Sequence, residues 1–170
     1  AEDTTPELPK GGEKLEFVEV EGDDGQPCKG TDRCAIFMSF NGQRNMEVKA
    51  TRDGKPASEL SIKWEVTQKG QWQSLQLGSK STFTTMTGDS VNTAKQTAQQ
   101  EAQYEVKAFI DGAADATPLY FDIAVTPKGQ VPLIVSYTYN GKRVFQGVTT
   151  YLYKQESPQK ALKCADVTAD

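Results

Sequence analysis

The sequence predicts an all-β protein whose main body is a β-sandwich, and three observations lead to this prediction. Apolar and polar residues alternate with a period of two in several segments of the 170-residue chain. Gly, Pro, Asn and Asp separate these segments at intervals of about ten residues. The hydrophobic fraction is 36%, which suits thin sheets whose alternate residues face water. Two half-apolar sheets must cover one another, so a sandwich is expected.

The first half of the chain contains four predicted strands. They are KLEFVEV at 14–20, CAIFMSF at 34–40, NMEVKA at 45–50 and LSIKWEV at 60–66. The segment DGKPAS at 53–58 is typical of a turn between the last two strands. In the fourth strand Leu60, Ile62, Trp64 and Val66 share one face, and the residues between them are polar. This alternation predicts a strand that is buried on one side only.

The middle of the chain continues the pattern of strands. TFTTMT at 82–87 and SVNTAKQTA at 90–98 are polar strands or strand edges, whereas YEVKAFI at 104–110 and LYFDIAV at 119–125 alternate clearly. AKQTAQQEAQ at 94–103 is compatible with a helix by propensity, but it is short and carries no apolar stripe. We therefore expect strand and loop there.

The two ends of the chain differ from this middle part. Residues 1–13 are polar and are interrupted by two prolines and two glycines, so they are expected to form a flexible N-terminal tether. Residues 128–170 predict a β-hairpin, because Asn140 and Gly141 favour a type I′ turn between two apolar segments. Such a short segment hardly supports its own core. The hairpin therefore either docks on the sandwich or begins a second β-domain, and the unpaired Cys164 favours the second alternative.

Cys28 and Cys34 are expected to form a disulfide, in preference to two free thiols. Their spacing is not that of a C-x2-C zinc or redox motif, and the chain has no histidine to complete a metal site with Cys164. A disulfide would pin the Gly-rich stretch CKGTDRC and would place the protein in an oxidising compartment. We therefore expect an extracytoplasmic location: secreted, at the cell surface or periplasmic. Cys164 remains a free thiol, an intermolecular link or half of another bridge.

Composition and charge exclude several function classes. The net charge is −4 with no basic stripe, which argues against nucleic acid as a partner. No apolar run approaches the length needed to cross a membrane, so membrane insertion is not expected. The absence of histidine removes the commonest general base, and no nucleophile motif is present, so we expect no enzyme and no cofactor.

Carboxylates gather in the predicted loops, but we expect no metal there. The spacing does not match a calcium-binding loop, and Asp is an ordinary turn residue. The residues concerned are Glu21, Asp23, Asp24, Asp32, Asp111 and Asp115. They are interpreted as solvated turns.

Residues 14–127 resemble bacterial immunoglobulin-like (Ig-like) domains of the invasin type. The segments that carry the resemblance are MEVKATRDGKPASELSIKWEV at 46–66, AQYEVKAFIDG at 102–112 and LYFDIAVTP at 119–127. The resemblance implies an Ig-like β-sandwich in which Trp64 is the buried tryptophan of the third strand. It also implies that Tyr104 forms a tyrosine corner whose hydroxyl binds upstream backbone.

The sequence departs from antibody domains at the positions of their inter-sheet cysteines. Val106 stands at one of these positions, and Met46 or Val48 stands at the other. The resemblance therefore implies a core held by packing alone, with Trp64, Tyr104 and Val106 as structural core residues.

The expected function is that of a non-catalytic, extracytoplasmic Ig-like module of a bacterial cell-surface or secreted protein. Such a module acts in adhesion, presentation or spacing, with a protein or glycan on a surface as its partner. A first alternative is a carbohydrate-binding module that stacks Trp72 on a sugar. A second is a protein-binding inhibitor that inserts the Cys28–Cys34 loop. Its contact residues would be Lys29, Thr31, Asp32 and Arg33.

Overall fold

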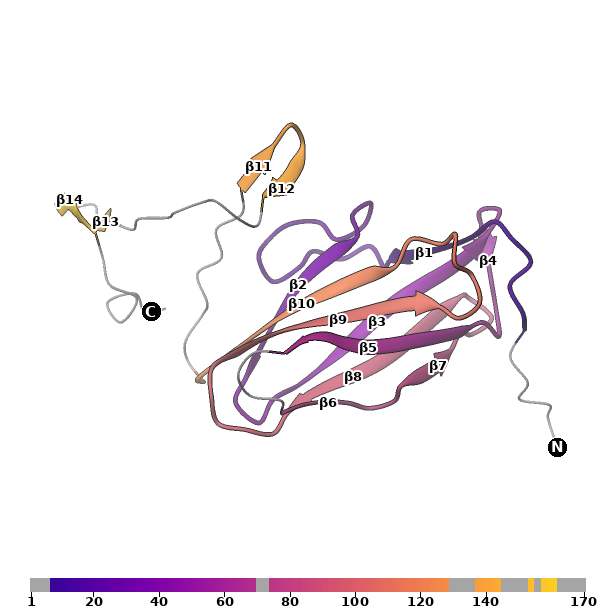
Figure 1. The fold of residues 1–170 in the computed structure, drawn as a ribbon, viewed down its shortest axis with the longest axis horizontal. Helices are drawn as coiled ribbons and strands as arrows, with labels where there is room; N and C mark the ends of the chain where they lie inside the picture. Colours follow the sequence, from indigo (N-terminus) through magenta and orange to yellow (C-terminus); the bar gives the residue numbers. More distant parts are fainter. Residues whose placement is uncertain (1–6, 70–73, 129–136, 145–152, 155–156, 162–170) are drawn as a thin grey trace. The chain divides into compact units, whose positions relative to one another are not determined.

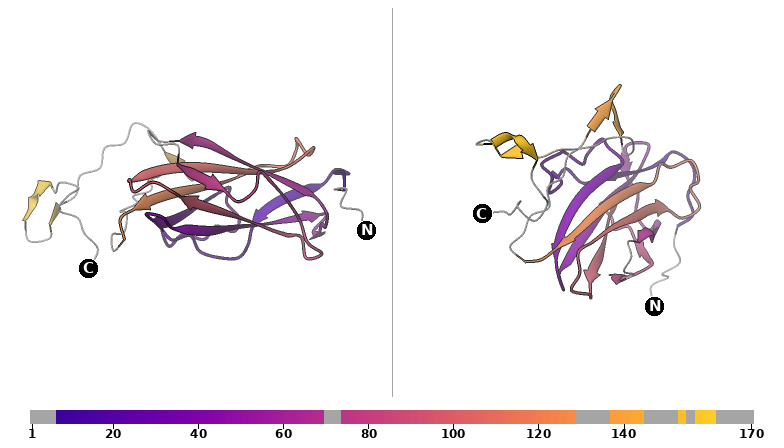
Figure 2. Two further views of the ribbon diagram at one scale, coloured as in Figure 1. Left: turned by 90° about the horizontal axis from the view of Figure 1, so that it is seen from below. Right: turned by 60° about the vertical axis from the view of Figure 1, so that its left-hand side comes forward.

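The computed structural model describes residues 7–69, 74–128, 137–144, 153–154 and 157–161 (Figure 1). The chain divides into two compact units, Ala1–Lys128 and Gly129–Asp170. Every regular element in the described residues is a β-strand, which confirms the all-β prediction. The first unit is a sandwich of two stacked sheets, visible edge-on in Figure 2.

The first sheet has the strand order β1-β3-β8-β6, with the short β4 also paired to β3, and all of its pairs are antiparallel. Its strands are β1 (Glu13–Phe17), β3 (Gln43–Arg52), β4 (Lys55–Pro56), β6 (Leu75–Leu77) and β8 (Asp89–Gln96). The turn between β3 and β4 has positive φ at Asp53 and Gly54, as a type I′ turn requires.

The second sheet has the order β2-β10-β9-β5-β7. Its strands are β2 (Arg33–Ser39), β5 (Ser61–Lys69), β7 (Ser81–Phe83), β9 (Ala102–Ile110) and β10 (Leu119–Thr126). Strands β2 and β10 run parallel, whereas the other pairs of this sheet are antiparallel.

The strand order identifies the immunoglobulin topology. When β1, β3, β5, β6, β8, β9 and β10 are named A to G in chain order, one sheet reads A-B-E-D and the other reads C-F-G. Strands β2 and β7 add one edge strand each to the second sheet. The predicted Ig-like β-sandwich is therefore confirmed.

Local alternation explains which faces are buried. In β3, Met46, Val48 and Ala50 are fully buried, and the residues between them are exposed or half-buried. In β5, Ile62 and Trp64 are buried in the same way. The inward-facing side chains of both sheets form one hydrophobic cluster. Its formation removes these apolar surfaces from water, which is the main force that holds the sheets together.

Hydrogen bonds also cross between the two sheets, so the expectation of a core held by packing alone is corrected. Trp64 Nε1 in β5 donates to Thr82 Oγ1 in β7 at 2.7 Å, and that hydroxyl lies 2.5 Å from Ser90 Oγ in β8 of the other sheet. At a second place, the Tyr104 hydroxyl in β9 donates to Gln96 Oε1 in β8 at 3.1 Å. Val106, Met46 and Val48 are fully buried in the shared core.

The Tyr104 hydroxyl contacts upstream side chains, and its expected contact with upstream backbone stays a prediction. Besides Gln96, it lies 3.0 Å from Ser74 Oγ, which itself lies 3.1 Å from Gln96 Oε1. Three side chains from separate segments therefore form one polar cluster at the end of β8. Gln96 is fully buried. Its Nε2 has no hydrogen-bond partner among the described residues.

Several strand ends differ from the prediction for local reasons. Strand β1 ends at Phe17, because the chain then bends so that Val20 N–H donates to Val18 C=O. Strand β7 ends at Phe83, because the Thr84 side chain bonds the backbone of Leu60 and Ala57. Strand β6 was not predicted. The expected strand and loop at 94–103 are present, as β8 and the connection to β9.

Part of the segment predicted as a tether is attached to the sandwich. Glu13 is the first residue of β1, and its carboxylate accepts the backbone N–H groups of Lys10 and Gly11. Arg52 Nε in β3 donates to the same carboxylate at 2.9 Å. Glu7 N–H also donates to Glu59 C=O at 2.8 Å. The N-terminal segment from residue 7 onward is thus hydrogen-bonded to the first unit.

The second unit contains the predicted hairpin. Strands β11 (Tyr137–Tyr139) and β12 (Lys142–Val144) pair antiparallel around Asn140 and Gly141, whose φ angles of 51° and 76° are those of a type I′ turn. A second antiparallel pair, β13 (Tyr153–Lys154) and β14 (Ser157–Ala161), was not predicted. Cys164 lies outside the described residues. Whether the hairpin docks on the sandwich or begins a second β-domain stays a prediction.

Candidate functional site

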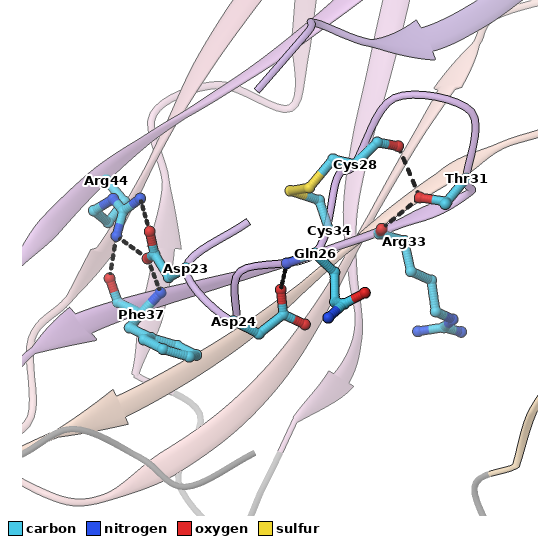
Figure 3. The surroundings of a disulfide bond; sticks show 9 residues. All are labelled: Asp23, Asp24, Gln26, Cys28, Thr31, Arg33, Cys34, Phe37 and Arg44. Carbon is cyan, nitrogen blue, oxygen red and sulfur yellow. Dashed lines mark hydrogen bonds and ion pairs between the residues drawn. A yellow bond between two sulfur atoms is a disulfide. The ribbon is translucent and has the colours of Figure 1, made fainter. Parts of the chain in front are cut away.

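The disulfide predicted from the cysteine spacing is present. Cys28 Sγ and Cys34 Sγ are 2.06 Å apart, and both residues are buried (Figure 3). Cys34 belongs to β2, and Cys28 lies in the segment that connects β1 to β2. The disulfide therefore joins this connecting segment covalently to the edge of the second sheet.

Hydrogen bonds order the loop that the disulfide closes. The Thr31 hydroxyl lies 2.7 Å from Cys28 C=O and 2.9 Å from Arg33 C=O (Figure 3). Tyr120 N–H of β10 donates to Asp32 C=O at 2.8 Å. Gly30 has φ of 86°, a left-handed conformation that glycine adopts without strain. The loop is thus preorganised before any partner meets it.

Three of the four residues predicted as partner contacts are exposed on this loop. Lys29, Thr31 and Asp32 present their side chains to solvent. Lys29 Nζ lies 3.7 Å from Glu19 Oε2, but both side chains are more than half exposed. An ion pair of that kind contributes little, about 0 to 1 kcal/mol. Lys29 can therefore exchange this partner for another at little cost.

Arg33, the fourth residue, binds the sheet beneath the loop. Its Nη1 lies 2.6 Å from Glu105 Oε2 in β9 and 2.8 Å from Asp122 Oδ1 in β10. The guanidinium also stacks over the ring of Tyr120, 4.6 Å from its centroid. The Arg33 guanidinium is thus bound to side chains of β9 and β10 beneath the loop. Of the four predicted contact residues, the other three form the exposed surface of the loop.

Glu105 is the centre of this polar cluster. Its second oxygen accepts a hydrogen bond from Thr67 Oγ1 of β5 at 2.6 Å, so the cluster connects four neighbouring strands. Burial alone would raise the pKa of the Glu105 carboxyl. The hydrogen bonds from Thr67 and Arg33 and the positive charge of Arg33 outweigh burial and hold this pKa below its usual range.

Two acidic residues of the β1–β2 connection, Asp23 and Asp24, accept hydrogen bonds from other residues of the sandwich. The Asp23 carboxylate pairs with Arg44 of β3 and accepts the backbone N–H of Phe37 (Figure 3). Asp24 Oδ1 accepts Gln26 N–H at 3.0 Å, which is an ordinary Asx turn. No group of three or more metal-ligating residues occurs in the described part of the chain. The pairing of Asp23 with Arg44 was not found from the sequence, because nothing local relates the two residues.

Trp72, the residue of the carbohydrate-binding alternative, lies outside the described residues, so that alternative stays a prediction. Trp64, Tyr104 and Val106 lie inside the sandwich, as described above. Within the described ranges, no helix has the length and apolarity to cross a membrane.

Comparison with known proteins gives weak structural similarities. No protein-family model matches the sequence, and no curated protein matches it significantly. The D0-D1 domain of intimin matches at 15% identity over 73% of this chain and 50% of its own, with a TM-score of 0.44. A C-terminal 282-residue intimin fragment, solved in complex with the intimin-binding domain of the translocated intimin receptor, matches at 16% identity. That match covers 49% of this chain and 27% of the fragment, with a TM-score of 0.40.

A family 123 glycoside hydrolase from Clostridium perfringens matches at 4% identity over 68% of this chain and 27% of its own, with a TM-score of 0.41. The present chain thus spans at most half of the length of these three structures. Since TM-scores this low do not define a shared fold, the Ig-like assignment rests on the strand order and register described above.

Proposed function

We propose that this chain is a non-catalytic, extracytoplasmic Ig-like module that acts in adhesion, presentation or spacing within a bacterial cell-surface or secreted protein. The observation that carries this proposal is the path of the chain. Strand β1 begins at one end of the sandwich, and β10 finishes at the opposite end, after which the chain continues into the second unit (Figure 1). A rigid module traversed in this way separates whatever is attached at its two ends.

The disulfide supports an oxidising compartment, because structural disulfides persist outside the reducing cytosol. The non-catalytic part of the proposal rests on composition and on the loop. The chain has no histidine, and Arg33, Glu105 and Asp122 are held in a structural ion-pair cluster.

The compartment is tested by trapping thiols in intact producing cells. A membrane-permeant maleimide is added before lysis, and the intact mass of the purified chain is then measured. One alkylated cysteine per chain is expected if Cys164 is a free thiol, and none if it is bridged, because Cys28 and Cys34 are joined to each other. Three alkylated cysteines in protein trapped at steady state would remove the extracytoplasmic assignment.

Spacing and specific adhesion are separated by a replacement experiment. Residues 13–126 are exchanged for an unrelated Ig-like sandwich of similar length, and attachment of the producing cells to their target surface is measured. Unchanged attachment identifies a spacer. Loss of attachment, with normal surface display of the hybrid, identifies recognition by the sandwich itself.

A second candidate, protein binding through the Cys28–Cys34 loop, is favoured by one specific observation. The loop is preorganised and exposes Lys29, Thr31 and Asp32, and a loop that is already ordered loses little entropy on binding. The combined variant Lys29→Ala with Asp32→Ala should abolish attachment if this candidate holds. Lys55→Ala with Asp115→Ala, at exposed positions away from this loop, is the matched control. Equal attachment of both variants would eliminate the candidate.

A further inference from the structure

Four strands stand at the ends of the two strand orders and are therefore edge strands, and β2 is the longest of them. β1 has five residues and β6 and β7 have three each, whereas β2 has seven. An edge strand presents unpaired N–H and C=O groups, to which a strand of another chain can pair. Short edge strands offer little pairing surface. Among the described edges, β2 therefore carries the greatest risk of unwanted pairing.

The backbone groups of β2 alternate between its neighbour and its free edge. Asp32 C=O accepts from Tyr120 N–H, and Phe40 N–H donates to Thr126 C=O, so the even-numbered residues bond β10. The odd-numbered residues consequently face the free edge. These four residues are Arg33, Ala35, Phe37 and Ser39.

All four carbonyl groups on this free edge already have partners in the same chain. The Arg33 carbonyl lies near Thr31 Oγ1, and the Ser39 carbonyl accepts Gly42 N–H. The two central carbonyls accept hydrogen bonds from residues that are more distant in the sequence. Ala35 C=O accepts Asp23 N–H at 2.9 Å, and Phe37 C=O accepts Arg44 Nη1 at 2.5 Å.

Asp23 takes the place of a residue of a neighbouring strand. Its backbone N–H bonds Ala35 C=O, while its carboxylate accepts Phe37 N–H at 2.7 Å (Figure 3). A residue of a paired strand would satisfy one donor and one acceptor of β2 in the same way. Arg44 then pairs with that carboxylate, so Asp23 does not leave an unbalanced charge at the edge.

The connecting segment is built to lie close to β2. At residue 22, a Cβ atom would lie 2.9 Å from the Ala35 carbonyl oxygen and 3.3 Å from Cys28 Sγ, so glycine permits this approach. The other end of the segment is joined to β2 by the Cys28–Cys34 disulfide. The segment thus has a close backbone contact at one end and a covalent bond at the other.

We propose that Asp23, Arg44 and the disulfide-pinned segment 22–28 form an edge plug that closes β2 to strand pairing with a second copy of this chain. A second copy is the natural occupant of an unplugged edge. Two identical β2 edges related by a two-fold axis run antiparallel and offer each other matching donors and acceptors. The plug acts whether the module serves as a spacer or as an adhesin.

The test compares self-association of the full chain with and without the two side chains of the plug, which hold the N–H and C=O groups of Phe37. The variant is Asp23→Ala with Arg44→Ala, studied by sedimentation velocity over a concentration series. The wild-type chain should stay monomeric over the whole series, which sets a lower limit on its dimer dissociation constant. The variant should dimerise with a dissociation constant at least about tenfold below that limit. The control is Lys63→Ala with Asp111→Ala, because that exposed pair belongs to the same sheet but not to the β2 edge. The control should behave as the wild type does.

A third substitution checks that the new dimer uses β2. Phe37→Pro, added to the double variant, removes the N–H group at the middle of the free edge and should restore the monomer. A folded double variant that stays monomeric overturns the proposal, and so does a dimer that Phe37→Pro leaves intact. If the double variant loses its sheet signal in circular dichroism, Asp23→Ser and Arg44→Met are measured singly. If both single variants are monomeric, the proposal is overturned as well.

Discussion

Tyr104 and Trp64 stand out among the individual residues, because each donates a hydrogen bond within a polar link between the sheets. Trp64 reaches Ser90 of the other sheet through Thr82, and Tyr104 reaches Gln96 directly. In antibody domains a disulfide in the core joins the two sheets. Here buried and half-buried polar side chains make the connection, and the buried ones depend on their partners, because a buried polar group without a hydrogen bond is costly.

Tyr104→Phe should therefore destabilise the sandwich measurably. The substitution keeps the ring but removes the hydroxyl shared by Gln96 and Ser74. The free energy of unfolding should fall by about 1 to 3 kcal/mol, measured by urea denaturation. Tyr120→Phe makes the same chemical change on a half-buried ring at the outer face and should stay within about 0.5 kcal/mol. Equal effects of both variants would contradict a special role of the Tyr104 hydroxyl.

Glu105 makes part of the stability depend on pH. Because its pKa is lower in the folded protein than in the unfolded chain, the unfolded state binds the proton more readily. The contribution of Glu105 should be complete above about pH 4.3 and should disappear as the pH falls through the lower folded value. Urea denaturation between neutral and acid pH should show a shallower acid loss in Glu105→Gln than in the wild type. The exposed Glu65→Gln should not change the slope.

At the scale of elements, β2 is held by several bonds besides its backbone pairing with β10. The disulfide holds its first residues, Arg33 binds β9 and β10, and the edge plug covers its free side. β2 also runs parallel to β10, which sets it apart from the antiparallel strands around it.

Removal of the disulfide should lower stability without unfolding the sandwich. The loop it closes is short, so Cys28→Ser with Cys34→Ser should reduce the free energy of unfolding by about 2 kcal/mol on the loop-entropy model. The measurement is denaturation at low protein concentration, so that self-association does not contribute. Cys164→Ser is present in both proteins that are compared, so that the third cysteine does not contribute to the difference. An unfolded double variant would show that the disulfide is required for the fold.

At the scale of the whole molecule, the sandwich and the second unit are separate compact bodies. Among the residues whose burial the structure describes, one large hydrophobic cluster runs from Leu15 to Val125, within the first unit. A unit with its own core has what it needs to fold independently.

Residues 7–128 should therefore fold as an isolated protein. The expected result is a single cooperative transition in calorimetry, with a midpoint close to that of the first unit in the full chain. A shorter fragment, residues 14–128, lacks the bonds that Lys10, Gly11 and Glu13 make at the N-terminal end and should melt at a lower temperature. If 7–128 shows no cooperative transition, the sandwich depends on the rest of the chain.

The alternating faces of β3 and β5 and the Asn140–Gly141 turn could be predicted because each is a local property of neighbouring residues. The disulfide could be predicted because two cysteines six positions apart in a polar stretch, in a chain without histidine, leave few other roles.

The remaining features depended on which distant segments meet. Arg33 and Glu105 are 72 positions apart, and Asp23 and Arg44 are 21 positions apart, so no local pattern relates them. The sequence by itself determined the longer strands of the sandwich, their inward faces and the disulfide, because these follow from short-range spacing. Only the tertiary structure decided the sheet order, the polar links between the sheets and the closed edge of β2, because they arise when strands distant in sequence become neighbours.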